Sequence, residues 1–275
     1  MANDLAAEGT GKGARRNSDF VQSLERGLMV IRAFDEENRE LALSDVARAT
    51  GLTRAAARRF LLTLVALGYV HFDGKLFSLR PRVLELGFAY LSSLTLPEVS
   101  QPHMEGLVAK INESSSISVL DDTEVVYVVR VPTRRIMTIT IAVGTRLPAY
   151  CTSMGRVLLA DLAPDVLEER LSRMELRPLT SRTVTERGKF LEILDGVRRQ
   201  GYAMVDQELE DGLRSAAVPI RDATGAVVAA LNVSVHASRA TLQVLRRDFV
   251  PLALETARAI EADLRGTNNA AIGRS

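Results

Sequence analysis

The stretch from Leu43 to Leu79 limits the possible folds of this chain more than any other part of it. Its residues predict a short helix over Ser44–Thr50, a tight turn at Gly51-Leu52 and a longer helix over Thr53–Leu67. Asp73-Gly74, between two β-rich runs, predicts a small hairpin, because glycine supplies the positive φ that a tight turn needs. Elements in this order predict a winged helix-turn-helix.

The longer helix has one apolar face and one small, cationic face when its residues are spaced at about 100° each. The face predicted to contact the core holds Thr53, Ala56, Ala57, Phe60, Leu64 and Leu67. Small residues near a helix start let its backbone enter a major groove about 12 Å wide, where arginines reach phosphates or guanine edges. The residues predicted to contact DNA are Thr53, Arg54, Ala55, Arg58, Arg59 and, at the wing tip, Lys75. The alternative is a solvated, arginine-bearing surface helix of another helical domain.

The totals exclude several classes of protein. The chain has 275 residues, enough for two domains, and a formal net charge of only +1, so any nucleic-acid binding must be local. The single cysteine excludes an internal disulfide and a cysteine-rich zinc site, and the three widely separated histidines argue against a metal site built from histidines. No apolar run is long enough to cross a membrane, and no apolar signal segment is present at the start. We therefore expect a cytoplasmic protein without metal or cofactor.

Changes in composition predict the domain boundaries. Residues 1–18 lack a hydrophobic period and predict a disordered tail, and residues 19–80 hold the winged helix-turn-helix. Residues 81–96 predict a linker helix, which serves as a spacer or as a dimer contact. Residues 97–265 predict a second domain, and residues 266–275 a polar tail.

The second domain alternates between helix and strand. The predicted helices are Pro97–Glu113, Gly155–Leu162, Pro164–Met174, Glu186–Gln200 and Leu242–Leu264. The predicted strands are Ser116–Leu120, Val125–Val131, Met137–Val143, Tyr202–Val205, Ala216–Arg221 and Val227–Val235. Strand pairs joined by tight turns, with helices between them, predict an α+β domain in which helices cover an antiparallel sheet.

The sequence shows no set of residues that would form a catalytic site. Cys151 lacks a nearby residue in the sequence that would lower the pKa of its thiol. The helix start at Ser153 offers free backbone N–H groups to an anion, or is simply capped. The acidic cluster from Val205 to Ser215 is either a solvated loop or part of a site. Asn232 and Ser234 point to one face of an apolar strand, where a bound polar ligand or other protein groups must satisfy them.

The sequence resembles the IclR family of transcriptional regulators from about Phe20 to Leu264. The resemblance is carried by Ser23-Leu24-Glu25-Arg26-Gly27-Leu28, Gly51-Leu52-Thr53, Ala149-Tyr150-Cys151-Thr152-Ser153-Met154-Gly155-Arg156 and the stretch from Asp206 to Ser215. Residues 127–131, 144–150 and 232–236 look most like the subgroup that controls aromatic-acid breakdown through protocatechuate and β-ketoadipate (PcaR, PcaU and PobR-like).

The resemblance implies a winged helix-turn-helix, a linker helix and a C-terminal GAF-like antiparallel sheet covered by helices. It also implies a homodimer, or a homotetramer built from two dimers. The effector contacts that it implies are Ser153, Met154, Val205, Asp206, Ser215, Asn232 and Ser234. The sequence departs from the family pattern at Thr53-Arg54-Ala55-Ala56, where Pro-x-Ser-Thr is more frequent. It also departs at Val205, where relatives often have an acidic residue, at Ser215, where they often have Cys, and at Asn232, where they often have Ser.

These observations predict a ligand-responsive, DNA-binding transcriptional regulator without catalytic activity. Its partners would be a palindromic double-stranded DNA operator and a small carboxylate or aromatic-acid effector, and it would control genes of aromatic-acid catabolism. The alternatives are an IclR-type regulator of another carbon-source pathway, a redox sensor that uses Cys151, and a hydrolase that uses the same thiol.

Overall fold

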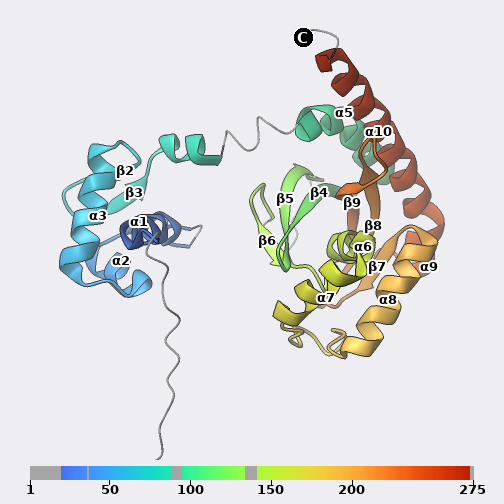
Figure 1. The fold of residues 1–275 in the computed structure, drawn as a ribbon, viewed down its shortest axis with the longest axis horizontal. Coiled ribbons are helices and arrows are strands. Elements are labelled where there is room, and N and C mark those ends of the chain that lie inside the picture. Colours follow the sequence, from blue (N-terminus) through green and yellow to red (C-terminus); the bar gives the residue numbers. More distant parts are fainter. Residues whose placement is uncertain (1–19, 36, 88–94, 134–140, 273–275) are drawn as a thin grey trace, which may run out of the picture. The chain divides into compact units, whose positions relative to one another are not determined.

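The computed structural model describes residues 20–35, 37–87, 95–133 and 141–272. The chain forms two compact units, Met1–Ala89 and Tyr90–Ser275, each with a hydrophobic core of its own (Figure 1). The tail predicted over residues 1–18 lies outside the described residues.

Among the described residues, three helices build the core of the N-terminal unit: α1 (Gln22–Arg32), α2 (Leu43–Thr50) and α3 (Arg54–Ala66). Helix α2 ends at Gly51, whose φ of 66° is the left-handed conformation that glycine adopts without strain. Helix α3 begins after Thr53, whose Oγ1 accepts a hydrogen bond from the N–H of Ala56 at 3.2 Å. The predicted helix-turn-helix therefore forms as expected.

The core face of α3 differs from the prediction at three positions, of which the first is Thr53, which was predicted to contact the core but is exposed. Leu61 is fully buried, because it lies four residues after Ala57 and three before Leu64 on the same stripe. Leu67 was predicted to be in the core but is 52% exposed. It follows the last helical residue, so its side chain no longer continues the stripe.

The wing is a three-stranded antiparallel sheet of β1 (Glu40–Leu41), β2 (Val70–Phe72) and β3 (Phe77–Leu79) in the order β1-β3-β2. Residues 73–76 form the turn, and the Asp73 carboxylate accepts hydrogen bonds from the N–H groups of Lys75 and Leu76, both at 2.7 Å. The turn is thus longer than the predicted two-residue turn. Strand β1 was not predicted, because two residues are too few to show a strand period.

The predicted linker helix is described only in part. A 3₁₀ turn, η1, covers Pro81–Leu84, residues 85–87 are helical, and residues 88–94 lie outside the described residues. The next helix, α5, spans Thr95–Ile111 and so begins inside the range predicted for the linker.

An antiparallel sheet of six strands, counted within the described residues, forms the middle of the C-terminal unit, in the order β6-β5-β4-β9-β8-β7. The strands are β4 (Ser114–Asp121), β5 (Glu124–Val131), β6 (Arg146–Pro148), β7 (Ala203–Asp206), β8 (Leu213–Arg221) and β9 (Val227–His236). A strand was predicted over Met137–Val143, but residues 134–140 lie outside the described residues and residues 141–143 form no strand. The edge strand is β6 instead, where Pro148 at the strand end is tolerated because an edge lacks a second neighbour.

Helices cover both faces of this sheet (Figure 1). One face packs on α5 and α10 (Val250–Ile272), and the other on α6 (Ser153–Asp161), with α7 (Pro164–Arg173) and α8 (Arg187–Gln200) completing that layer. The alternation along β9 explains the division, because Leu231 and Val233 enter the α5 and α10 layer. The residues that alternate with them, Ala230 and Asn232, face the α6 layer.

The last helix is longer and less regular than predicted. It consists of α9 (Leu242–Val244), a π-helical turn η2 (Leu245–Phe249) and α10, which continues to Ile272 rather than ending at Leu264. Pro251 explains the π turn, because a proline lacks the N–H that a regular helix requires and its ring clashes with the preceding turn. No proline follows between Leu264 and Ile272, so nothing in the backbone forces an earlier stop.

Candidate functional site

The exposed face of α3 presents the arginines that the sequence analysis selected. Arg54, Arg58 and Arg59 are exposed, and within the described residues none of them forms a salt bridge with a carboxylate. Arg48 on α2 differs, because Asp45 holds its guanidinium at 2.8 Å. Unpaired guanidinium groups on a convex helix face can bind phosphate oxygens or guanine edges.

The remaining predicted DNA contacts lie on the same unit. Ala55 is exposed on α3, and Lys75 is exposed in the wing turn. Thr53 is also exposed, but its Oγ1 accepts the capping hydrogen bond of α3. Its hydroxyl hydrogen can still be donated to a phosphate.

A cavity of about 200 Å³ lies between the sheet and the N-terminal end of α6 in the C-terminal unit. Six of the seven predicted effector contacts line it, namely Ser153, Met154, Val205, Ser215, Asn232 and Ser234. Other polar residues that line the cavity were not among the predicted contacts, namely Glu113, Tyr127, Arg130, His236 and Arg239. Glu210 and Asp211 of the acidic cluster also line it, so this cluster is part of the site.

The N-terminus of α6 forms one wall of the cavity. Thr152 Oγ1 accepts a hydrogen bond from the N–H of Gly155 at 3.1 Å, which leaves the N–H groups of Ser153 and Met154 without a partner inside the helix. Ser153 Oγ is buried and, within the described part of the chain, has no hydrogen-bond partner. Free N–H groups at the positive end of a helix dipole favour an anion.

The adjoining strands carry polar side chains in register. Ser234 on β9 pairs with Ser215 on β8 and with Ser114 on β4. Asn232 Oδ1 accepts a hydrogen bond from the N–H of Ser116 at 3.0 Å, and its amide nitrogen donates to Ser234 Oγ at 3.0 Å. Protein groups therefore satisfy part of this polar row, and the rest faces the cavity.

Asp206 is the one predicted contact that does not line the cavity. It follows Val205 on β7, and successive side chains of a strand point to opposite faces. Arg214 binds the Asp206 carboxylate at 2.6 Å and Arg182 binds it at 3.0 Å. Desolvation raises the pKa of Asp206, but the hydrogen bonds from Arg214 and Gln207 outweigh it, so the pKa lies below its usual value. Asp206 acts in this structure as an ion-pair partner.

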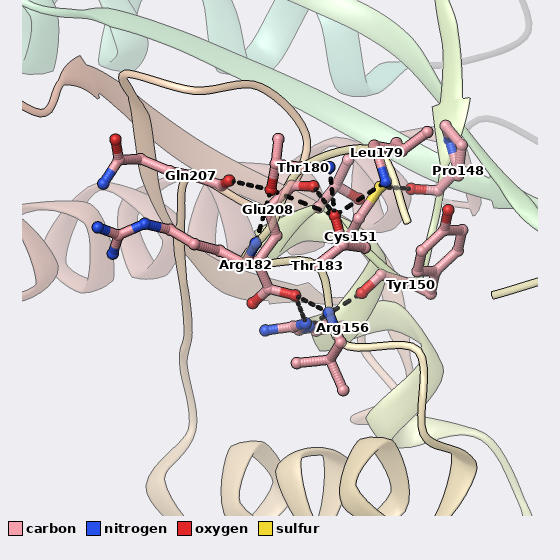
Figure 2. Close-up of polar contacts among 12 residues, drawn as sticks. Pro148, Tyr150, Cys151, Arg156, Leu179, Thr180, Arg182, Thr183, Gln207 and Glu208 are labelled. Carbon is pink, nitrogen blue, oxygen red and sulfur yellow. Dashed lines mark hydrogen bonds and ion pairs between the residues drawn. The ribbon is translucent and has the colours of Figure 1, made fainter. Parts of the chain in front are cut away.

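A buried ion pair joins the cavity wall to the acidic loop. Arg156 donates to Glu208 at 2.6 Å, with side-chain exposures of 3% and 9%, and its Nε donates to the carbonyl of Tyr150 at 3.0 Å (Figure 2). The hydroxyls of Thr180 and Thr183 donate to the carbonyls of Gln207 and Glu208, both at 2.7 Å (Figure 2). These contacts fix α6, the acidic loop and the segment between α7 and α8 to one another.

Cys151 is a buried residue of the cavity lining. Its Sγ lies 3.6 Å from the carbonyl oxygen of Pro148 (Figure 2). Burial raises the pKa of the Cys151 thiol to about 12, although the charge of Arg156 lowers it in part. A thiol with a raised pKa is a poor nucleophile at neutral pH.

Both units match known family profiles. Residues 88–262 match the profile described as bacterial transcriptional regulator IclR C-terminal, and residues 23–74 match the IclR helix-turn-helix domain. The chain belongs to the IclR family. Members of this family are DNA-binding transcriptional regulators rather than enzymes, which confirms the prediction for this chain and argues against a Cys151 hydrolase.

The relatives of the chain confirm the fold and the subgroup. It is 45% identical to the Pca regulon regulatory protein of Pseudomonas putida over 249 residues, which covers 90% of this chain and 86% of that protein. It is 40% identical over 247 residues to the p-hydroxybenzoate hydroxylase transcriptional activator of Acinetobacter baylyi, covering 88% and 91%. A crystal structure of an IclR homolog from Microbacterium hydrocarbonoxydans complexed with 4-hydroxybenzoate is 29% identical, with a TM-score of 0.78 and coverage of 89% and 99%.

Three of the positions where this chain departs from the IclR family pattern, Val205, Ser215 and Asn232, lie at the cavity. Val205 and Ser215 face each other on neighbouring strands, and Asn232 lies on the next strand.

Among the described residues, no helix is both long and apolar enough to cross a membrane.

Proposed function

We propose that this IclR-family regulator binds a palindromic operator through α3 and the wing, and that a small carboxylate in the cavity changes its affinity for that operator. The cavity carries the proposal, because it combines a free helix N-terminus with an unpartnered buried hydroxyl at Ser153. The protein has one state with higher and one with lower affinity for DNA. A ligand changes the DNA affinity only if it binds these two states with different affinities, and that difference sets the largest possible change.

The DNA-binding half of the proposal rests on the exposed arginines of α3. Phosphate contacts would orient the protein, and Arg54 or Arg58 would read guanine edges in the major groove. A palindromic operator requires two copies of the protein. An exposed apolar stripe on α1, which includes Leu24 at 63% and Leu28 at 48% exposure, supports a homodimer, or a pair of dimers, because surfaces of this kind mark interaction sites.

The ligand class rests on the cavity and on the relatives. Ser153 and Met154 would donate backbone N–H groups to the ligand, while Ser215, Asn232 and Ser234 would orient it with neutral hydrogen bonds. One relative regulates a Pca regulon, another activates p-hydroxybenzoate hydroxylase transcription, and a third was crystallised with 4-hydroxybenzoate. We infer that this chain responds in the cytoplasm to an aromatic acid or to a product of its breakdown, such as protocatechuate or β-ketoadipate.

Fluorescence anisotropy tests both halves of the proposal. The full-length protein is titrated into a labelled fragment of its own upstream intergenic region at fixed salt. The titration is then repeated with protocatechuate, β-ketoadipate or 4-hydroxybenzoate. We expect tight binding that shifts about 5- to 150-fold with one of these acids, the usual range for coupled sites.

Two other outcomes would contradict parts of the proposal. Tight DNA binding that none of the acids changes would support the role in DNA binding and contradict the assignment of an aromatic-acid effector. An absence of specific binding to the fragment would remove the predicted role of α3 at this operator.

A further inference from the structure

Arg130 lines the cavity from β5, which is separated from β9 by β4 in the sheet. It pairs across the sheet with Ser116 on β4, and Ser116 pairs with Asn232 on β9. The three residues therefore lie in one row across three strands and share the face toward α6. Arg130 and Asn232 both line the cavity, so an arginine closes the end of the polar row.

Arg130 lacks the carboxylate partner that the other arginines around this cavity have. Arg239 pairs with Glu113 at 2.8 Å, Arg156 with Glu208 at 2.6 Å and Arg214 with Asp206 at 2.6 Å. Within the described residues no acidic side chain forms a salt bridge with Arg130.

The neighbouring sequence does not offer a partner either. From residue 125 to residue 160 the chain contains no aspartate or glutamate, and this range includes residues 134–140, which the structure does not describe. The acids of the cavity lining, other than Glu113, are Glu210 and Asp211 on the acidic loop. Asp211 is exposed and Glu210 partly exposed, so water screens them.

The surroundings of Arg130 favour a bound anion. A partly buried guanidinium loses hydration that an ion pair restores, and it remains protonated at neutral pH. Burial raises the pKa of the neighbouring Tyr127 to about 12, so its phenol also remains a hydrogen-bond donor. The N-terminus of α6 adds only about half a charge. Among the arginines that line the cavity, Arg239 pairs with Glu113, and Arg130 forms no ion pair in the described structure.

We propose that Arg130 binds the carboxylate of the effector and makes the cavity select acids over their neutral analogues. This inference rests on the proposed function of the cavity as the effector site. A planar guanidinium can donate two parallel hydrogen bonds to a carboxylate, which a carboxamide cannot accept in the same way. The serines and Asn232, as neutral groups, orient the ligand without this preference.

Isothermal titration calorimetry on the full-length protein tests the inference with matched ligand pairs. Each acid is compared with its own amide, 4-hydroxybenzoate with 4-hydroxybenzamide and protocatechuate with 3,4-dihydroxybenzamide, and β-ketoadipate is titrated as a third acid. We expect Arg130→Gln to weaken binding of the acid about 10- to 100-fold and to leave binding of the amide within about 3-fold. Unchanged amide binding also shows that the variant retains a folded cavity.

Three further variants sharpen the test. Arg130→Lys keeps the charge but loses the planar pair of donors, so we expect an intermediate loss of acid binding. Arg182→Gln removes an arginine of the same unit that pairs with Asp206 away from the cavity, and should leave the preference for acids unchanged. Arg239→Gln tests the competing cation of the cavity and should also retain that preference.

The outcomes separate this inference from the proposed function. If the wild-type protein binds none of the acids, the proposed function fails, and the inference fails with it. If acids bind but Arg130→Gln keeps the full preference for acids over amides, the inference alone is wrong. Loss of that preference in Arg239→Gln and not in Arg130→Gln would overturn it as well.

Discussion

At the scale of single residues, burial determines what Cys151 can do. Its thiol has a pKa raised from 9.0 to about 12 by burial, so the neutral form is favoured in the folded protein. The stability that this neutral thiol contributes is fully present below pH 9 and is lost as the pH rises toward 12. We expect the native protein at pH 8 to react with a thiol reagent at least about 100-fold more slowly than the protein in denaturant.

Rapid labelling of the native protein would instead favour the redox-sensor alternative. The variant Cys151→Ser provides the control, and it should retain the response of DNA binding to the effector. Loss of that response together with sensitivity of the wild type to oxidant would contradict a purely structural thiol.

The ion pair between Arg156 and Glu208 is a second feature at the residue scale. Glu208→Ala would leave the buried Arg156 guanidinium without its carboxylate, and we expect the free energy of unfolding to fall by about 3–5 kcal/mol. Urea unfolding followed by circular dichroism measures the change. The matched control is Glu168→Ala, because Glu168 binds Arg187 at 2.5 Å with both side chains exposed, and such pairs contribute at most about 1 kcal/mol.

At the scale of elements, the start of α6 depends on Gly155. A Cβ at this position would lie 2.1 Å from the carbonyl oxygen of Ala149, a backbone atom that cannot move aside as a side chain can. We expect Gly155→Ala to displace the helix start, to lower the free energy of unfolding by about 1–3 kcal/mol and to abolish effector binding. Thermal unfolding and calorimetry measure the two effects.

Gly196 in α8 offers the control for this prediction. Apart from its chain neighbours and the backbone of its own helix, no heavy atom of the described residues lies within 4 Å of a Cβ built there. Gly196→Ala should stabilise the protein by about 0.4–1 kcal/mol, because alanine reduces the freedom of the unfolded chain. Equal effects of the two substitutions would show that helix propensity and not the close approach to Ala149 determines the result.

At the scale of the whole molecule, the two units should divide the work. Arg58→Ala should weaken operator binding and leave effector affinity unchanged. If Arg58 contacts a phosphate, the slope of log DNA affinity against log salt concentration should also become smaller by about 1. Ser234→Ala should weaken effector binding and leave the DNA affinity of the unliganded protein unchanged. Anisotropy and calorimetry on the same preparations measure both, and identical behaviour of the two variants would contradict the division.

The sequence by itself determined most of the elements and much of the cavity lining. Helix-turn-helix, wing and sheet strands follow from interactions between residues a few positions apart, such as the Asp73 turn and the Thr53 cap. The two-residue spacing of Asn232 and Ser234 is sufficient to place both side chains on one face of a strand. The family resemblance supplied the remaining expected contacts.

The tertiary structure decided what depends on residues far apart in the chain. Strand register places Arg130 in a row with Asn232, about 100 positions away in the sequence, and no local pattern encodes that register. The direction of β7 turns Val205 toward the cavity and Asp206 away from it, a choice that a one-residue shift would reverse. Only the folded chain shows which arginines are paired, because Coulomb interactions depend on distances in space. That dependence is the physical reason why the unpaired charge of Arg130 could not be recognised from the sequence.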